Sequence, residues 1–217
     1  MSSSSYAASV PSSAERSRHW DDAYSTRGTQ GVSWFQSEPT VSLELIVSLG
    51  LDVTTPVVDI GGGASVLADR LLGAGFTDVS VLDVSEVALK AGRRRIGNTR
   101  SVQCLHEDLL SWSPARRYGL WHDRAVFHFL TDEDDQGVYL ETMRSALLPG
   151  GSLVLATFAE DGPQRCSGLP VSRYSVEHLR ARLGSRFDLM VSRRELHTTP
   201  GGAVQPFTWI AGTVGGA

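Results

Sequence analysis

The sequence predicts a doubly wound α/β domain, in which a mostly parallel seven-stranded sheet ends in an antiparallel hairpin. Two observations lead to this prediction. From Pro56 onward, short apolar runs alternate with amphipathic stretches, which is typical of right-handed βαβ units that cover a parallel sheet with helices. The last two apolar runs are joined by a Pro-Gly-Gly loop without a helix, so they should pair antiparallel.

Length and composition suit one globular domain. The chain has 217 residues, of which 20% are charged and 41% hydrophobic, and its net charge of −4 argues against a nucleic-acid partner. No stretch approaches the length of a membrane span, and the N-terminal residues lack the pattern of a secretory signal. Cys104 and Cys166 give neither a disulfide framework nor metal-ligand spacing. We therefore expect a cytoplasmic protein with no bound metal and no membrane partner.

The N-terminal part combines a polar tail with an aromatic segment. Residues 1–14 are Ser-rich, which predicts a disordered tail, and residues 15–217 are expected to form a single domain. A short helix is predicted over 14–28, with Trp20 and Tyr24 on one face. A loop with Trp34 and Phe35 follows, and a helix is predicted over 40–51, where Gly50 lies near its C-cap.

Strands and helices then alternate. We expect strands over residues 56–60, 78–83, 101–108, 118–124, 151–158, 187–196 and 206–214, and helices within 64–75, 85–97, 131–150 and 175–184. Thr131 is predicted as the N-cap of the third of these helices, because three acidic residues follow it. The segment LLPGG is expected to end that helix and to turn into the next strand.

A glycine-rich turn follows the first predicted strand. Gly61, Gly62 and Gly63 allow the backbone to approach a ligand closely and to adopt positive φ. Asp83 closes the second strand, where a carboxylate can accept hydrogen bonds from both hydroxyls of a ribose. The pattern therefore predicts a ligand that contains an adenosine-like ribose.

Two nucleotide cofactors fit that pattern to different degrees. A dinucleotide fingerprint requires a third glycine where this chain has Val66. Asp59 precedes the glycines and places negative charge where a pyrophosphate would lie, whereas it suits a ligand with an ammonium group. These charges favour S-adenosylmethionine over NAD, and an NAD(P)-binding oxidoreductase remains the alternative from another class.

Five segments in order carry a family resemblance. VVDIGGGAS, VSVLDVS, HEDLL, WHDRAVFHFL and LLPGGSLVLATF resemble the motifs of class I S-adenosylmethionine-dependent methyltransferases, over the chain from about Trp20 onward. The segment HWDDAYSTRGTQGVSWF is similar to the start of a subgroup that includes small-molecule thiol methyltransferases and some protein lysine methyltransferases. The resemblance implies a Rossmann-like methyltransferase fold, with S-adenosylmethionine as cofactor and S-adenosylhomocysteine as its product.

The resemblance also implies a set of residues around the donor. Its members are Asp59, Gly61, Gly62 and Gly63 at the methionine moiety, Asp83 at the ribose, Val84 and Leu109 at the adenine ring, Asp108 at the adenine amino group, and His122 facing the methyl group. The alternative for Asp59 and Asp108 is a structural role at a helix or turn.

The residues beyond the fourth strand are candidates for catalysis. Asp123 and His128 cluster there, and a base is useful when the acceptor must lose a proton. Trp34 and Phe35 are expected to cover the acceptor, or alternatively to plug the edge of the core.

The long loop over residues 160–175 lies beyond the fifth strand. Its Arg165 and Arg173 would bind an acceptor carboxylate, or alternatively are solvated.

The sequence thus predicts an S-adenosylmethionine-dependent methyltransferase that acts on a thiol, amine or hydroxyl of a small molecule. A protein lysine N-methyltransferase is the nearest alternative, and a non-catalytic cofactor-binding protein is a further one. HDRA stands where many relatives have the D/N-P-P-Y signature of nucleobase or glutamine methylation, so the sequence argues against these two acceptors. The sequence determines neither the acceptor nor the oligomeric state.

Overall fold

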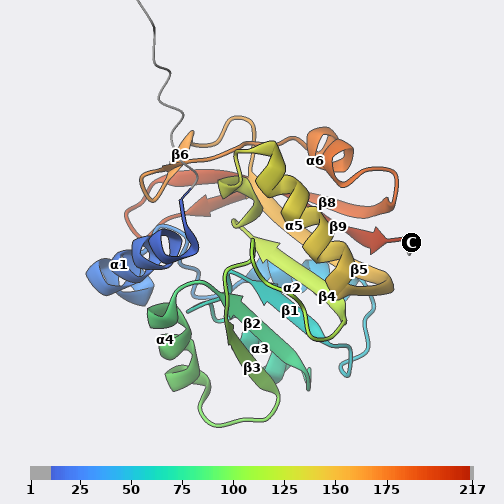
Figure 1. The fold of residues 1–217 in the computed structure, drawn as a ribbon, viewed down its shortest axis with the longest axis horizontal. Helices are drawn as coiled ribbons and strands as arrows, with labels where there is room; N and C mark the ends of the chain where they lie inside the picture. The colour runs from blue at the N-terminus through green and yellow to red at the C-terminus, as the bar shows by residue number, and fades with distance from the viewer. Residues whose placement is uncertain (1–10, 216–217) are drawn as a thin grey trace, which may run out of the picture.

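Seven strands form the central sheet in a computed structural model that describes residues 11–215 (Figure 1). They are β1 (Val57–Ile60), β2 (Val79–Asp83), β3 (Val102–His106), β4 (Tyr118–Arg124), β5 (Leu147–Phe158), β8 (Phe187–Thr198) and β9 (Val204–Val214), in the order β3-β2-β1-β4-β5-β9-β8. The first five pair parallel, and β9 pairs antiparallel with both β5 and β8. The predicted fold class is confirmed.

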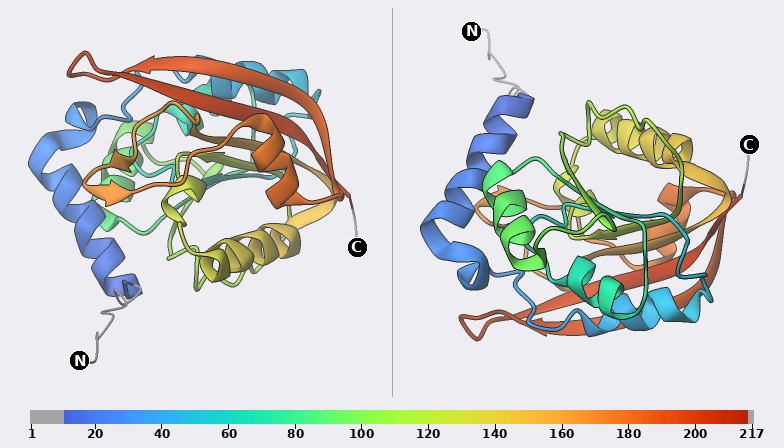
Figure 2. Two further views of the ribbon diagram at one scale, coloured as in Figure 1. Left: turned by 90° about the horizontal axis from the view of Figure 1, so that it is seen from above. Right: turned by 90° about the horizontal axis from the view of Figure 1, so that it is seen from below.

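Helices cover both faces of this sheet (Figures 1 and 2). They are α1 (Ser13–Gly31), α2 (Thr40–Ser48), α3 (Leu67–Gly73), α4 (Glu86–Ile96), α5 (Glu133–Ala146) and α6 (Val176–Leu183). Apolar side chains of α5 and α6 pack on one face of the sheet, and those of α2, α3 and α4 pack on the other. Every residue of β1 and β2 is buried, as expected for strands that have helices on both sides.

Several elements differ locally from the prediction. Asp132, and not Thr131, caps α5, because its carboxylate accepts a hydrogen bond from the Asp134 backbone N–H at 2.8 Å. The LLPGG segment belongs to β5, which begins at Leu147, and β4 has a register shift opposite it. A small hairpin of β6 (Arg165–Cys166) and β7 (Leu169–Pro170) and a 3₁₀ turn, η1 (Phe127–Phe129), were not predicted.

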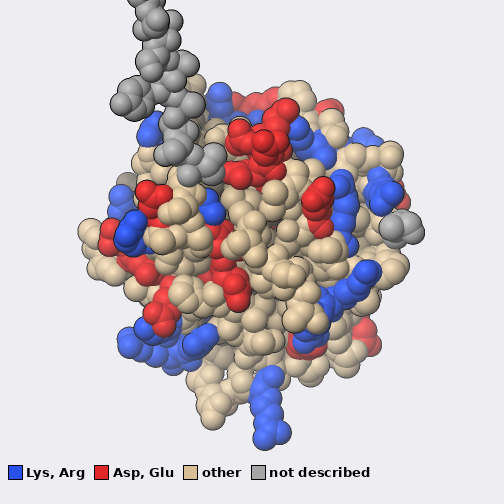
Figure 3. Space-filling view, in the orientation of Figure 1, with Lys and Arg blue, Asp and Glu red and all other residues tan. Residues whose placement is uncertain are grey.

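The predicted N-terminal tail lies mostly outside the described residues. Of residues 1–14, only 11–14 are described, and Ser12 caps α1 through a capping box with Glu15. The last two residues of the expected tail therefore belong to the helix. Among the described residues, no helix combines the length and the apolar character needed to cross a membrane. On the face drawn in Figure 3, acidic and basic side chains are interspersed, and acids gather near the start of α5.

Helix α1 positions the site. It lies across one end of the sheet, next to α4 (Figure 2). Gly28 interrupts its helical geometry with φ 68° and ψ 173°, so the chain turns there and leads into the loop with Trp34 and Phe35. As a result, both predicted aromatics reach the carboxyl ends of β1 and β4.

Candidate active site

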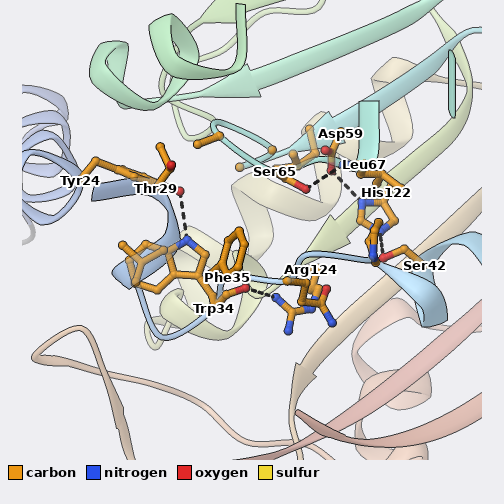
Figure 4. Close-up of a pocket in the computed structure, with 17 residues that line it drawn as sticks. Tyr24, Thr29, Trp34, Phe35, Ser42, Asp59, Ser65, Leu67, His122 and Arg124 are labelled. Carbon is orange, nitrogen blue, oxygen red and sulfur yellow. Dashed lines mark hydrogen bonds and ion pairs between the residues drawn. The ribbon is translucent and has the colours of Figure 1, made fainter. Parts of the chain in front are cut away.

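A cavity of about 60 Å³ lies at the carboxyl ends of β1 and β4 (Figure 4). Its walls come from α1, the loop after it, α2, the glycine turn and β4. Six of the residues expected from sequence line it: Trp34, Phe35, Asp59, Gly61, Gly62 and His122. The other lining residues were not expected there, and they include Tyr24, Ser42, Ser65 and Arg124.

Three buried polar side chains form a hydrogen-bonded chain on one wall. His122 Nδ1 lies 2.7 Å from Asp59 Oδ1, and His122 Nε2 lies 3.0 Å from the Ser42 hydroxyl (Figure 4). Because an ionised carboxylate only accepts hydrogen bonds, Nδ1 donates to Asp59, and Nε2 is left to accept from Ser42. The arrangement gives His122 a fixed orientation and a basic nitrogen on the cavity side.

Aromatic side chains close the opposite wall. Trp34 Nε1 donates to the Tyr24 hydroxyl at 3.0 Å, and both rings pack edge-to-face at 5.7 Å. Trp20 packs edge-to-face between Trp34, at 5.5 Å, and Phe129, at 5.0 Å. This cluster ties α1 and its following loop to η1, so water is excluded from that side of the cavity.

The glycine turn leaves no room for side chains. Gly61 and Gly63 have φ of 65° and 36°. A Cβ on Gly62 would collide with the Asp59 carboxylate, and one on Gly63 would collide with that of Asp83. The glycines therefore allow two acidic side chains to pack against the turn, in addition to the positive φ that sequence reasoning expected.

Acidic charge concentrates at this edge. Asp83 is 7% exposed, and its Oδ1 accepts the Ser85 N–H at 2.7 Å. The pKa of Asp83 is raised to about 7, chiefly by burial and also by the nearby carboxylates of Asp59 and Asp21, against the opposing hydrogen bond from Ser85. Negative potential at this position suits a cationic ligand.

Hydrogen bonds from Arg16 and Asp21 hold helix α1 against the same edge. Arg16 donates from Nε and Nη2 to Asp108 Oδ2, at 2.9 and 2.7 Å, and the Leu110 N–H donates to Asp108 Oδ1 at 3.1 Å. Asp21 Oδ1 accepts from the Ser85 hydroxyl at 2.6 Å and from the Val87 N–H at 3.1 Å, at the start of α4. Both oxygens of Asp108, the residue expected at the adenine amino group, are thus engaged within the protein.

Removing the Arg16 side chain is expected to strengthen donor binding. In Arg16→Ala, Asp108 Oδ2 no longer has its guanidinium partner and can accept from an adenine amino group. We expect the affinity for S-adenosylhomocysteine to rise about threefold, or about 0.7 kcal/mol, when measured by calorimetry. Arg18→Ala, on the same helix, is the control. A loss of affinity specific to Arg16→Ala would mean that Arg16 itself supports the bound donor.

Asp123 and His128 do not line the cavity. Asp123 accepts from the Val126 and Phe127 N–H groups at 2.8 and 3.1 Å and from the Tyr139 hydroxyl at 2.7 Å, on the α5 face of the sheet. His128 is buried, and its Nδ1 accepts the Phe158 N–H at 3.3 Å. Burial lowers the pKa of His128 to about 3, which makes it a poor base at neutral pH. The structure thus places both residues away from the cavity, in contacts within the fold.

The two arginines of the 160–175 loop are also outside the cavity. Arg165 donates to the Gly168 carbonyl, and Arg173 donates to the Gly162 carbonyl at 3.1 Å. Both thus hydrogen-bond within their own loop and do not point into the cavity with the other candidates.

The remaining candidates lie beside the cavity, along the ends of β2 and β3. Val84 is half-buried, and its carbonyl lies 3.2 Å from His106 Nε2, whereas Leu109 is buried in the core. Together with Asp83 and Asp108 they line an edge that could hold a nucleoside. The residues present thus fit S-adenosylmethionine, because the glycine turn admits a close approach and the acids complement its cationic groups.

Comparisons with known proteins agree with this geometry. Residues 57–151 match a family model described as a methyltransferase domain. The chain is thus similar to methyltransferase domains over the segment that contains β1, the glycine turn, Asp83 and Asp108. A solved structure with the same methyltransferase fold is a 1,6-didemethyltoxoflavin-N1-methyltransferase of Burkholderia thailandensis with bound substrate and S-adenosylhomocysteine (TM-score 0.73, 20% identity, covering 96% of this chain and 92% of that one). Another is the N-methyltransferase NodS of Bradyrhizobium japonicum (TM-score 0.66, 18% identity, covering 81% and 93%).

Sequence similarity to curated methyltransferases is confined to part of the chain. A malonyl-[acyl-carrier protein] O-methyltransferase of Ilyobacter polytropus is 24% identical over 106 residues, which are 48% of this chain and 40% of that protein. The match thus spans well under two thirds of the relative's length.

Proposed function

We propose that this protein is an S-adenosylmethionine-dependent methyltransferase that methylates a thiol, amine or hydroxyl of a small-molecule acceptor. The observation that carries the proposal is the His122–Asp59 pair on the wall of a cavity that adjoins the glycine turn. Relatives with this fold include N-methyltransferases, and a curated relative is an O-methyltransferase, which supports the coarse reaction without selecting the acceptor atom.

In such a reaction, different residues would bind the donor and remove the proton from the acceptor. Asp83 would hold the ribose hydroxyls, while Asp59 and the glycine turn would hold the amino-acid end. Bound S-adenosylmethionine supplies an electrophilic methyl group and a neutral sulfur leaving group. His122 Nε2, directly or through Ser42, would take the proton from the acceptor atom, and the Asp59 carboxylate would stabilise the imidazolium.

The aromatic wall has a separate part in the proposal. Methyl transfer from a cationic donor to a neutral or anionic acceptor disperses charge, so a dry cavity helps. Trp34 and Phe35, with Tyr24 behind Trp34, would exclude water and align the acceptor. Their position on the cavity wall favours the covering role over a plug at the edge of the core.

The acceptor class follows from the shape of the site. Small-molecule sites usually measure about 300–1,000 Å³, so the cavity of about 60 Å³ must widen to admit an acceptor. Helix α1 and the loop after it would move to widen it, because they are attached to the sheet and to α4 through side-chain hydrogen bonds. An enclosed site of this kind favours a metabolite over a lysine on a folded protein. The lysine reading would require an open acidic-aromatic groove.

Methyl-label transfer tests the proposal. Purified protein is incubated with methyl-tritiated S-adenosylmethionine and desalted lysate, with and without added metabolites, and the acid-precipitated and soluble fractions are counted separately. We expect label in the soluble fraction, and much less of it with the Asp83→Asn variant. Nuclease-resistant label in the precipitate would instead support a protein lysine. Binding of S-adenosylhomocysteine with no label in either fraction would indicate a non-catalytic binding protein.

A further inference from the structure

Arg124 lies on the cavity wall, where β4 ends, and part of its guanidinium group is buried. Its Nη1 donates to the Trp34 carbonyl at 3.0 Å (Figure 4). Its guanidinium carbon lies 4.7 Å from the centre of the Phe207 ring. The residue as a whole is only half-buried, yet Nε and Nη2 have no solvent contact and no hydrogen-bond partner among the described residues. One edge of the guanidinium group is therefore unsatisfied.

The Glu195 carboxylate acts on this charge electrostatically, but no carboxylate within residues 11–215 accepts a hydrogen bond from the guanidinium group. The two carboxylate oxygens of Glu195 are engaged elsewhere. Oε1 accepts from Gln36 Nε2 and Oε2 accepts from Trp209 Nε1, each at 2.8 Å. Asp59 is paired with His122. Burial raises the pKa of the Cys166 thiol to about 11, so that group is neutral at physiological pH. Because buried N–H donors without an acceptor are costly, the free edge of Arg124 suits an anionic ligand.

The geometry of the free edge selects the kind of anion. Nε and Nη2 lie on the same side of the planar guanidinium group and point in parallel, which matches the two oxygens of a carboxylate. We propose that Arg124 binds a carboxylate of the acceptor through Nε and Nη2, so that the acceptor is a small carboxylic acid. This inference rests on the proposed function and narrows its substrate class.

A carboxylate at this position has two sources, because the methionine end of the donor also carries one. The position of Arg124 favours the acceptor. The donor edge runs from Asp83 on β2 to Asp59 on β1, whereas Arg124 extends from β4 toward Phe207 on β9, on the far side of β5. It also contacts the Trp34 carbonyl, in the loop proposed to cover the acceptor.

Thermal stability provides the first test, since it requires no turnover. Arg124→Met removes the charge and keeps much of the volume, so we expect a higher Tm than wild type. Arg193→Met, at an exposed arginine on β8, is the control and should leave Tm unchanged. A lower Tm for Arg124→Met would show that the arginine is structural and would overturn the proposal.

Matched acid and amide probes provide the second test. Mercaptoacetate, salicylate and anthranilate are each compared with the corresponding amide, in the presence of S-adenosylhomocysteine. We expect at least one acid, and not its amide, to raise the Tm of wild type, and Arg124→Lys, which keeps the charge but loses the parallel donors, to reduce that shift at least about fivefold. Equal effects of acid and amide, or no effect of any acid, would overturn the proposal.

A third measurement separates the two carboxylates. Calorimetry compares S-adenosylhomocysteine with its decarboxylated analogue in wild type and Arg124→Lys. We expect both proteins to show the same ratio of dissociation constants. A ratio close to one in the variant alone would assign Arg124 to the carboxylate of the donor and overturn the acceptor assignment. Because these readouts are binding and stability, a lack of methyl transfer would count against the proposed function alone.

Discussion

Asp83→Asn is expected to weaken binding of S-adenosylhomocysteine by at least about tenfold, or about 1.4 kcal/mol, and also to stabilise the fold at about pH 8. The amide retains an acceptor for the Ser85 N–H but loses the charge and one acceptor for the ribose hydroxyls. Calorimetry measures the first effect, and thermal unfolding the second. Asp22→Asn, on the exposed side of α1, is the matched control.

The effect on stability follows from the raised pKa of Asp83. An aspartate has a pKa of about 3.9 in the unfolded chain, whereas burial raises that of Asp83 to about 7 in the folded protein. Between these values the folded state holds the additional proton, so stability falls as pH rises through this window. Above it the ionised, buried carboxylate costs on the order of 4 kcal/mol, and Asp83→Asn removes this cost.

Two outcomes would contradict the prediction for Asp83. Unchanged donor affinity in Asp83→Asn would remove the ribose assignment. A Tm at about pH 8 that is lower than that of wild type would mean that hydrogen bonding, rather than desolvation, dominates at this carboxylate. Wild-type donor affinity should also fall as pH decreases below about 7, because Asp83 then becomes protonated.

The second large effect is expected at His122. His122→Gln should lower kcat by about 10²-fold to 10⁴-fold, the usual range for a general base, while the dissociation constant of S-adenosylhomocysteine changes less than about threefold. The variant keeps an amide that can still contact Asp59 or Ser42 but cannot take a proton. Its kcat should then increase steadily with pH, since deprotonated acceptor must come from solution.

Three further variants make the test at His122 specific. Ser42→Ala should lower kcat less than His122→Gln, because a water molecule can replace the hydroxyl. His178→Gln, at an exposed histidine paired with Glu160, should have no effect. His128→Gln separates the sequence-based assignment from the structural one. If His128→Gln lost turnover while His122→Gln retained it with normal donor binding, the base would have to be reassigned.

The fold was accessible from sequence because its signals are local. Each strand that ends near the site is a short apolar run beside a turn, and the Pro-Gly-Gly loop alone indicates the antiparallel hairpin. The errors are local as well. Thr131 and Asp132 are both good caps, and only the backbone geometry selects the second. The LLPGG segment has the composition of a turn, yet pairing with β4 extends β5 through it.

The site was only partly predictable, because much of it depends on contacts between distant segments. Ser42 is an ordinary helix residue until β4 places His122 at 3.0 Å from it. Arg124 lies next to the expected Asp123, but alternation along β4 directs the two to opposite faces of the sheet. This alternation was the sequence signal that could have identified Arg124, because it places Arg124 on the same face as His122 and Asp123 on the opposite face.

The strand order has a consequence for how the protein is made. β9 is the last strand along the chain, yet it lies between β5 and β8, and its Phe207 stacks beneath Arg124. During synthesis, β5 therefore has an open edge until residues 204–214 have left the ribosome, and the contact between Phe207 and Arg124 forms last. A nascent chain stalled before Val204 would contain every residue proposed to bind the donor and still lack the ring that packs against Arg124.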